Sequence, residues 1–125
     1  MSAIASVSEP DFNAEVGNNN NGVLVISLTG NADLNVKTHL DNFLIAVHEE
    51  ARRLAVTDVE VDVRHLEFMN SSCLKSLVGW ISRIQDEPPA KQYRVLFRSS
   101  PQLFWQRRSL HALSCLASDL VSVQT

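Results

Sequence analysis

The sequence predicts one α/β domain with a mixed, mostly parallel sheet of about five strands and helices mainly on one face. Apolar β-branched runs alternate along the chain with stretches whose apolar residues recur every three or four positions. One predicted strand alternates strictly between apolar and charged residues, which favours a sheet with one less covered face. The 125 residues suit a single domain over residues 12–125, preceded by a flexible, polar N-terminal tail over residues 1–11.

Two strands are predicted before the first helix. Residues 12–16 form a short strand, and residues 23–29 (VLVISLT) form a buried central strand that Gly30 ends. Between them, the glycines and asparagines of residues 17–22 tolerate positive φ and predict a hairpin loop.

The first helix is predicted from Asn35, its N-cap, to Leu54, over roughly five turns. One of its faces is apolar. The residues of that face are Val36, Leu40, Phe43, Leu44, Val47, Ala51 and Leu54. A strand with one buried face follows over residues 59–66, since Val59, Val61 and Val63 alternate with charged residues.

Two further helices and two strands complete the prediction. Asn70-Ser71-Ser72 is typical of a helix N-terminus, and Pro88-Pro89 stops the helix that follows. Residues 93–97 form a strand. Ser100 caps a third helix with Pro101 in its first position, and residues 120–123 form the last strand.

Composition excludes several classes of partner. The net charge of −3 and pI of about 5.7 argue against nucleic acid and against a polybasic membrane contact. No apolar run approaches the length of a membrane span, so no membrane insertion is expected, and no secretory signal is visible. Cys73 and Cys115 stand among apolar residues, which predicts a reduced, cytosolic protein.

Nothing in the sequence predicts an enzyme, a metal site or a cofactor. The four histidines do not stand at metal-ligand spacing with another His or Cys, and we expect them in surface or capping roles. The sequence has neither a Gly-rich phosphate loop nor a nucleophile elbow.

The segment Asn70-Ser71-Ser72 is the most informative part of the chain, and it has two interpretations. A phosphate on Ser71 or Ser72 would lie at the electropositive start of a helix, where anions are stabilised. Alternatively, Asn70 only caps the helix and the serines are small first-turn residues.

The stretch from Val61 to Leu74 (VDVRHLEFMNSSCL) resembles, without gaps, the signature of the STAS domain, the fold of bacterial anti-sigma factor antagonists. VLVISLTGNAD, which ends at Asp33, and Ser100-Pro101-Gln102-Leu103 also resemble segments of that family. The resemblance covers residues 12–123. It implies a non-catalytic regulatory phosphoprotein with Ser71 as the acceptor and Ser72 as the second choice.

The same resemblance implies how such a switch works. The unmodified protein binds a serine kinase or anti-sigma-like factor, phosphorylation releases it, and a phosphatase resets the cycle. The implied contact surface consists of Asp33, Asn70, Ser71, Ser72, Cys73 and Lys75. Two residues depart from the family pattern, since Asn70 and Cys73 replace the usual Asp and Gly. A related group of regulatory phosphoproteins, tied to biofilm control, also has Asn before its phosphorylated Thr.

Several alternatives remain open at this point. STAS-like chains also serve as constitutive accessory subunits, for example of transport ATPases, in which case Ser71 is not modified. Cys73 is either a packing residue or a reactive thiol at a helix start. Either Phe104 or Trp105 is expected to be exposed, because adjacent residues cannot both face the core. Trp80 either flanks a partner groove or packs at a helix edge, and a homodimer is possible.

Overall fold

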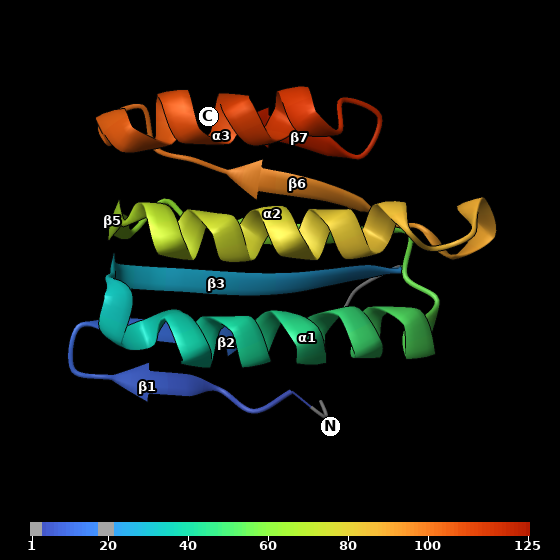
Figure 1. Ribbon diagram of the computed structural model, residues 1–125, viewed down its shortest axis with the longest axis horizontal. Helices are drawn as coiled ribbons and strands as arrows, with labels where there is room; N and C mark the ends of the chain where they lie inside the picture. The colour runs from blue at the N-terminus through green and yellow to red at the C-terminus, as the bar shows by residue number, and fades with distance from the viewer. Residues whose placement is uncertain (1–3, 18–21) are drawn as a thin grey trace.

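The structure is a computed structural model that describes residues 4–17 and 22–125. Two β-strands, β1 (Val7–Glu9) and β2 (Phe12–Val16), precede the long strand β3 (Val23–Ala32). The remaining elements, in chain order, are η1 (Leu34–Val36), α1 (Lys37–Leu54), β4 (Asp58–Asp62), β5 (Leu66–Met69), α2 (Ser71–Gln85), η2 (Pro89–Lys91), β6 (Arg94–Arg98), α3 (Phe104–Leu116) and β7 (Val121–Gln124) (Figure 1).

Within the described residues, the strands form one mixed sheet of seven strands in the order β1-β2-β3-β4-β6-β7, with β5 paired to the far end of β3. The pairs β1–β2 and β2–β3 are antiparallel, and all the others are parallel. The predicted fold class is confirmed, but the sheet has two strands more than expected. β1 lies in the range predicted as a tail, and the predicted strand over residues 59–66 is two strands, β4 and β5.

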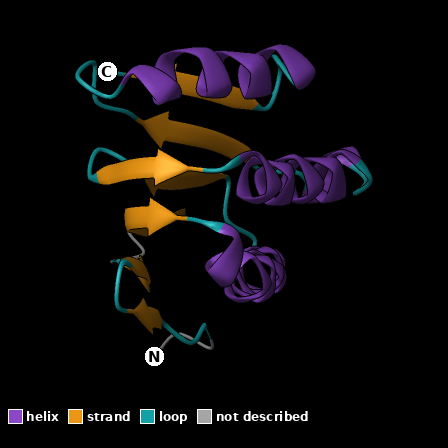
Figure 2. Ribbon diagram, turned by 60° about the vertical axis from the view of Figure 1, so that its left-hand side comes forward, coloured by secondary structure: helices purple, strands orange, loops and turns teal. Residues whose placement is uncertain are grey.

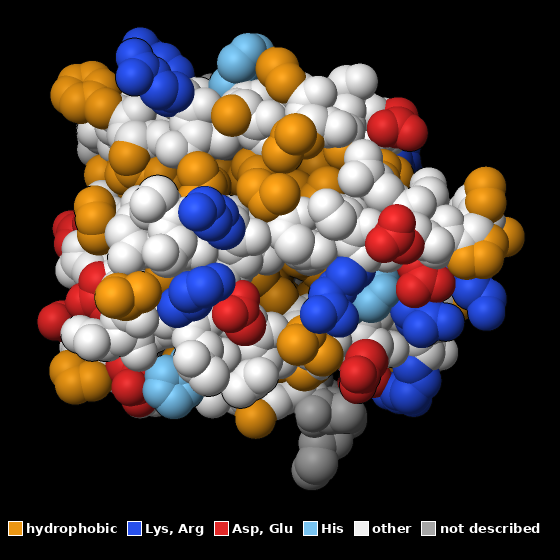
Figure 3. All heavy atoms as spheres, in the orientation of Figure 1, with side chains coloured by type: hydrophobic (Ala, Val, Ile, Leu, Met, Phe, Trp, Pro, Cys, Tyr) orange, Lys and Arg blue, Asp and Glu red, His pale blue; other side chains and the backbone are white. Residues whose placement is uncertain are grey.

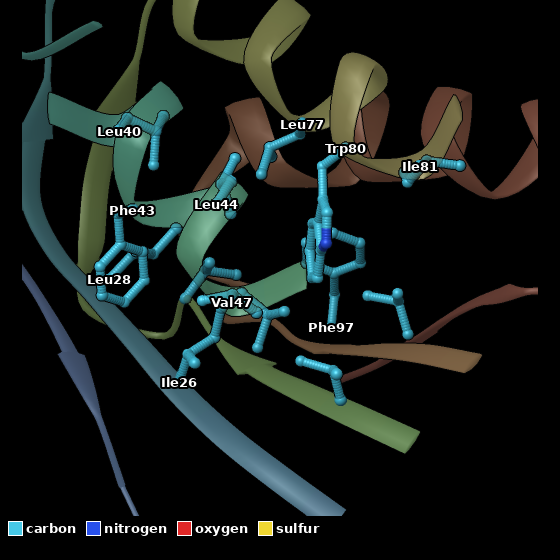
Figure 4. Close-up of a cluster of buried hydrophobic side chains, with 14 of the residues drawn as sticks. Ile26, Leu28, Leu40, Phe43, Leu44, Val47, Leu77, Trp80, Ile81 and Phe97 are labelled. Carbon is cyan, nitrogen blue, oxygen red and sulfur yellow. The ribbon is translucent and has the colours of Figure 1, made fainter. Parts of the chain in front are cut away.

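Helices α1 and α2 lie side by side on one face of the sheet (Figure 2). Their apolar faces pack against alternate residues of the central strands. The cluster in Figure 4 joins Leu40, Phe43, Leu44 and Val47 of α1 and Leu77, Trp80 and Ile81 of α2 to Ile26, Leu28 and Phe97 of the sheet. Burial of this apolar area is the main stabilising contribution to the fold.

The opposite face of the sheet is lined by charged pairs instead of helices. Asp58 pairs with Arg94 at 3.0 Å and Glu60 with Arg98 at 2.7 Å, and each of these pairs joins β4 to β6. These residues alternate with the buried valines of β4, so one face of the strand packs and the other meets water. The alternation in the sequence predicted this difference correctly.

Gly30 lies inside β3 and does not end it, contrary to the sequence prediction. Its φ is +94°, a region that favours glycine, and the register of β3 with β5 shifts directly after it. A Cβ at this position would overlap the carbonyl oxygen of Asp11. β3 therefore changes its pairing at Gly30, and its last residues pair with β5 instead of β4.

A hydrogen-bonded chain crosses the core between α1, α2 and the start of β6. Trp80 Nε1 donates to Tyr93 Oη at 2.8 Å, and that oxygen lies 2.7 Å from His48 Nδ1. His48 Nε2 lies 3.2 Å from the carboxylate of Glu87. Every group is satisfied when the Tyr93 hydroxyl donates to Nδ1 and Nε2 donates to Glu87. His48 is therefore a buried residue, not the surface or capping residue that we expected. Trp80 packs in the core, at the base of a hollow between α1 and α2.

Two predicted helix caps are wrong. Asp33, not Asn35, caps the turn before α1, since its Oδ1 accepts from Asn35 N at 2.9 Å. Ser100 and Pro101 form a turn, and α3 begins only at Phe104. In both places the residue that we predicted as the cap lies in a short turn that precedes the helix. The expected hairpin loop lies mainly in residues 18–21, which are outside the described residues.

Candidate functional site

The candidate site is the N-terminus of α2, directly after β5. Asn70 has extended backbone angles, and its Oδ1 accepts from the N–H of Cys73 at 2.8 Å. Its carbonyl accepts from the N–H of Leu74 at 3.0 Å. Within the described part of the chain, the N–H groups of Ser71 and Ser72 make no hydrogen bond. This end of the helix therefore keeps two donors and the positive end of its dipole.

The end of β3 fixes this helix start in place. The N–H of Asn70 donates to Ala32 O at 2.9 Å, and the thiol of Cys73 donates to the carbonyl of Asp33 at 3.2 Å. Two segments far apart in the sequence, around Asp33 and around Asn70, thus meet at one end of the sheet. The resemblance grouped these residues, and the structure brings them together.

Within this group the side chains differ in exposure. Ser71 and Lys75 are exposed, whereas Asp33, Asn70 and Ser72 are half-buried. Ser71 and Lys75 are four residues apart in α2, so they lie on the same side of the helix. Lys75 makes no hydrogen bond or ion pair with any described residue, whereas Lys37 nearby is held by Ser76 Oγ at 3.0 Å and by Asp41.

Cys73 lies beneath this surface and not on it. Its side chain is fully buried, and burial raises the pKa of its thiol. A thiol that is buried and protonated is a poor nucleophile, which favours the packing interpretation over the reactive one. Cys115, which we expected among apolar neighbours, is instead exposed on α3.

Gln106 in the first turns of α3 is a structural residue of this site that the sequence reasoning missed. Its Nε2 donates to the carbonyls of Val63 and Leu66, and its Oε1 accepts from Ser100 N at 2.8 Å. Trp105 Nε1 donates to the same Leu66 carbonyl at 3.0 Å. α3 thus holds β5, the strand that leads into Ser71. A polar residue on an otherwise apolar helix face was the only signal for this role.

Exposed apolar side chains lie on the elements that meet the start of α2 at one end of the molecule. Leu34 of η1 is 67% exposed, Phe68 of β5 is 47% exposed and Phe104 of α3 is 81% exposed. The elements that carry them meet at the left end of the molecule in Figure 1, and apolar side chains stand out on that edge in Figure 3. Phe104, not Trp105, is the exposed member of the aromatic pair. Large apolar side chains exposed around one point are typical of a protein-binding surface.

Comparisons with known proteins identify the fold. No family model matches the sequence, and no curated protein matches it. A crystal structure of an anti-sigma factor antagonist from Mycobacterium paratuberculosis superposes with a TM-score of 0.62 at 22% identity, over 92% of this chain and 89% of that one. The anti-sigma factor antagonist SpoIIAA in its unphosphorylated form gives 0.57 at 20% identity, over 90% and 88%.

The chain therefore has the STAS fold, the fold of these anti-sigma factor antagonists, along nearly its whole length. This confirms the fold that the resemblance implied. No helix among the described residues is long and apolar enough to cross a membrane.

Proposed function

We propose that this protein is a cytoplasmic regulatory switch without catalytic activity of its own, controlled by phosphorylation of Ser71. In this proposal the unmodified protein binds a serine kinase or anti-sigma-like partner through the surface around Asp33, Asn70, Ser71, Ser72 and Lys75. Phosphorylation of Ser71 releases the partner, and a phosphatase restores binding. Ser72 is the second candidate acceptor.

The observation that carries this proposal is the exposed Ser71 at the capped start of α2, at the end of the molecule where η1, β5 and α3 carry exposed Leu34, Phe68 and Phe104. A kinase needs an accessible hydroxyl, and a partner needs apolar anchors close to it. The likeness to anti-sigma factor antagonists, one of them solved in its unphosphorylated form, supports the same function.

The electrostatics of the site also support a switch that leaves the fold intact. A phosphate on Ser71 would add about −2 charges beside the unbonded N–H groups of Ser71 and Ser72, and Lys75 one turn along is a further cation. The charge is thus stabilised by the protein itself. At the same time it would be placed among the apolar side chains that contact the partner, where a charge opposes burial.

The test is a binding experiment from native lysate with wild type, Ser71→Ala, Ser71→Asp and Ser72→Asp as baits, and with Ser82→Asp, exposed near the other end of α2, as the matched control. We expect one partner to bind wild type, Ser71→Ala and Ser82→Asp but not Ser71→Asp. Phosphopeptide mapping of the protein isolated from cells should then find the phosphate on Ser71. Equal recovery on all baits would contradict the switch and favour a constitutive accessory subunit. Loss with Ser72→Asp alone would move the acceptor to Ser72.

A further inference from the structure

A second surface, remote from Ser71, lies at the β7 edge of the sheet. Among the described residues β7 pairs only with β6, so its other side exposes backbone groups. Such an edge is a template for pairing with another strand unless the protein protects it.

The two edges of this sheet differ in protection. β1, at the other edge, has three residues, carries Glu9 and is followed by Pro10. A short edge strand with a charge and a nearby proline pairs poorly with other chains. β7 (VSVQ) has neither charge nor proline, and its Val123 is 38% exposed. β7 is therefore the edge open to strand addition.

The hydrogen bonds of β7 show which of its backbone groups face outward. The carbonyls of Leu120 and Gln124 accept from β6 and its extension, at 2.7 Å from Val95 N and 2.8 Å from Ser99 N. Backbone groups alternate in direction along a strand, so those of Val121, Val123 and Thr125 face away from β6. The N–H of Val121 is already bonded to Ala117 O at 2.8 Å. The outward groups that remain are the Val121 carbonyl, both groups of Val123 and both groups of Thr125.

We propose that β7 pairs antiparallel with β7 of a second copy of this chain, about a two-fold axis at Val123. In this register the N–H and C=O of Val123 bond those of Val123 in the second copy. The Thr125 N–H bonds the Val121 carbonyl of the second copy, and the reverse bond follows by symmetry. Each of these outward groups finds its complement except the Thr125 carbonyl, whose would-be donor, the Val121 N–H of the second copy, is bonded to Ala117 O; that carbonyl stays in water.

The groove beside this edge suits a copy of the same surface. It lies between α3 and β7, has a volume of about 710 Å³, and is lined by His111, Cys115 and Val123 among others. Of the described residues that line it, Arg107 alone is of the Lys, Arg, Asp and Glu types. A surface with so little charge can meet its own copy without strong like-charge repulsion. This favours a second copy over a highly charged partner.

The first test is the oligomeric state of the whole chain by sedimentation equilibrium over a wide concentration range. Val123→Pro removes an outward donor without removing a β6 hydrogen bond, so the fold should persist. Val123→Lys places a charge at the edge, and Leu54→Lys is the matched control, since Leu54 is 39% exposed on α1. We expect a wild-type dimer whose dissociation constant rises about tenfold or more in both Val123 variants but not in Leu54→Lys.

Crosslinking gives a second readout. Cys115 is exposed and lines the groove, whereas Cys73 is buried, so a bis-maleimide should join two copies through Cys115. The crosslinked dimer should disappear in Cys115→Ser and diminish in Val123→Lys. Circular dichroism would establish whether each variant is folded. If Val123→Pro does not fold, Val123→Lys alone decides the test. A monomer at every concentration would overturn the proposal, as would a dimer that both folded Val123 variants leave intact.

Discussion

The side-chain amide of Gln106 donates to the backbone carbonyl of Leu66 at 3.2 Å, and this bond ties the first turns of α3 to the strand that leads into Ser71. The same amide holds Val63 and the N–H of Ser100. One buried side chain therefore joins β5, the β4–β5 turn and the loop before α3. The position of the candidate switch depends on a residue that itself lies away from the surface.

Replacement of this residue should destabilise the fold. Gln106→Leu keeps the apolar part of the side chain but leaves buried backbone groups without partners, so we expect the free energy of unfolding to fall by about 2–4 kcal/mol. Urea unfolding monitored by circular dichroism measures it. Gln102→Leu is the control, because the side chain of Gln102 is exposed and should change stability by about 0.5 kcal/mol at most. Equal effects of the two variants would contradict the role of Gln106.

A pair of glycine substitutions tests the requirement for Gly30 at the point where β3 changes its pairing. Gly30→Ala places a Cβ against the Asp11 carbonyl at a positive φ, and we expect a loss of about 2–4 kcal/mol. Gly79→Ala is the opposite case, since nothing lies within 4 Å of a Cβ there and the residue is inside α2. That variant should gain about 1 kcal/mol. Thermal and urea unfolding of both variants would show whether the two changes differ in sign.

Alkaline pH should destabilise the fold through ionisation of Tyr93, which is the only tyrosine of the chain. Burial raises the pKa of Tyr93 above its ordinary value of 10.0. The stabilisation from its neutral form is complete below pH 10.0 and is lost as the pH rises further, since the unfolded chain then ionises first. The ultraviolet absorbance of tyrosinate should show no ionisation before the protein unfolds. A reversible titration near the ordinary value in the folded protein would contradict the buried position.

The two cysteines should differ sharply in reactivity. Cys115 is exposed, whereas burial raises the pKa of the Cys73 thiol. We expect a thiol reagent to modify Cys115 rapidly in the native protein and Cys73 only after denaturation. Mass spectrometry of wild type and Cys115→Ser measures this. Fast native labelling of Cys115→Ser would revive the reactive interpretation of Cys73.

Much of the fold could be predicted because the signals are local. The strict alternation of Val59, Val61 and Val63 indicated a half-covered sheet, and the periodicity around Leu40 and Leu77 indicated the helices. β5 escaped prediction because Arg64 and His65 form a tight turn within one continuous pattern. β1 escaped because three residues carry too little periodicity to stand out from a polar tail.

The candidate site was predictable only in part. The cap by Asn70 is a local rule and was found from the sequence. The contact of Cys73 with Asp33 and that of Gln106 with Leu66 join residues about forty positions apart, which no local pattern encodes. The buried His48–Tyr93 pair could not be predicted for the same reason. Whether a histidine on an amphipathic helix is buried depends on its neighbours from other elements.

The two tryptophans of the chain occupy different surroundings, and this gives the protein two internal optical probes. Trp80 is hydrogen-bonded inside the core, whereas Trp105 is half-buried, bonded to the carbonyl of Leu66 and next in the chain to the exposed Phe104 of the candidate site. The emission of Trp105 should therefore shift when a protein partner covers the surface around Phe104, while the emission of Trp80 should respond to unfolding. Single-tryptophan variants, Trp80→Phe and Trp105→Phe, would let fluorescence separate occupancy of the surface from integrity of the core without any added label.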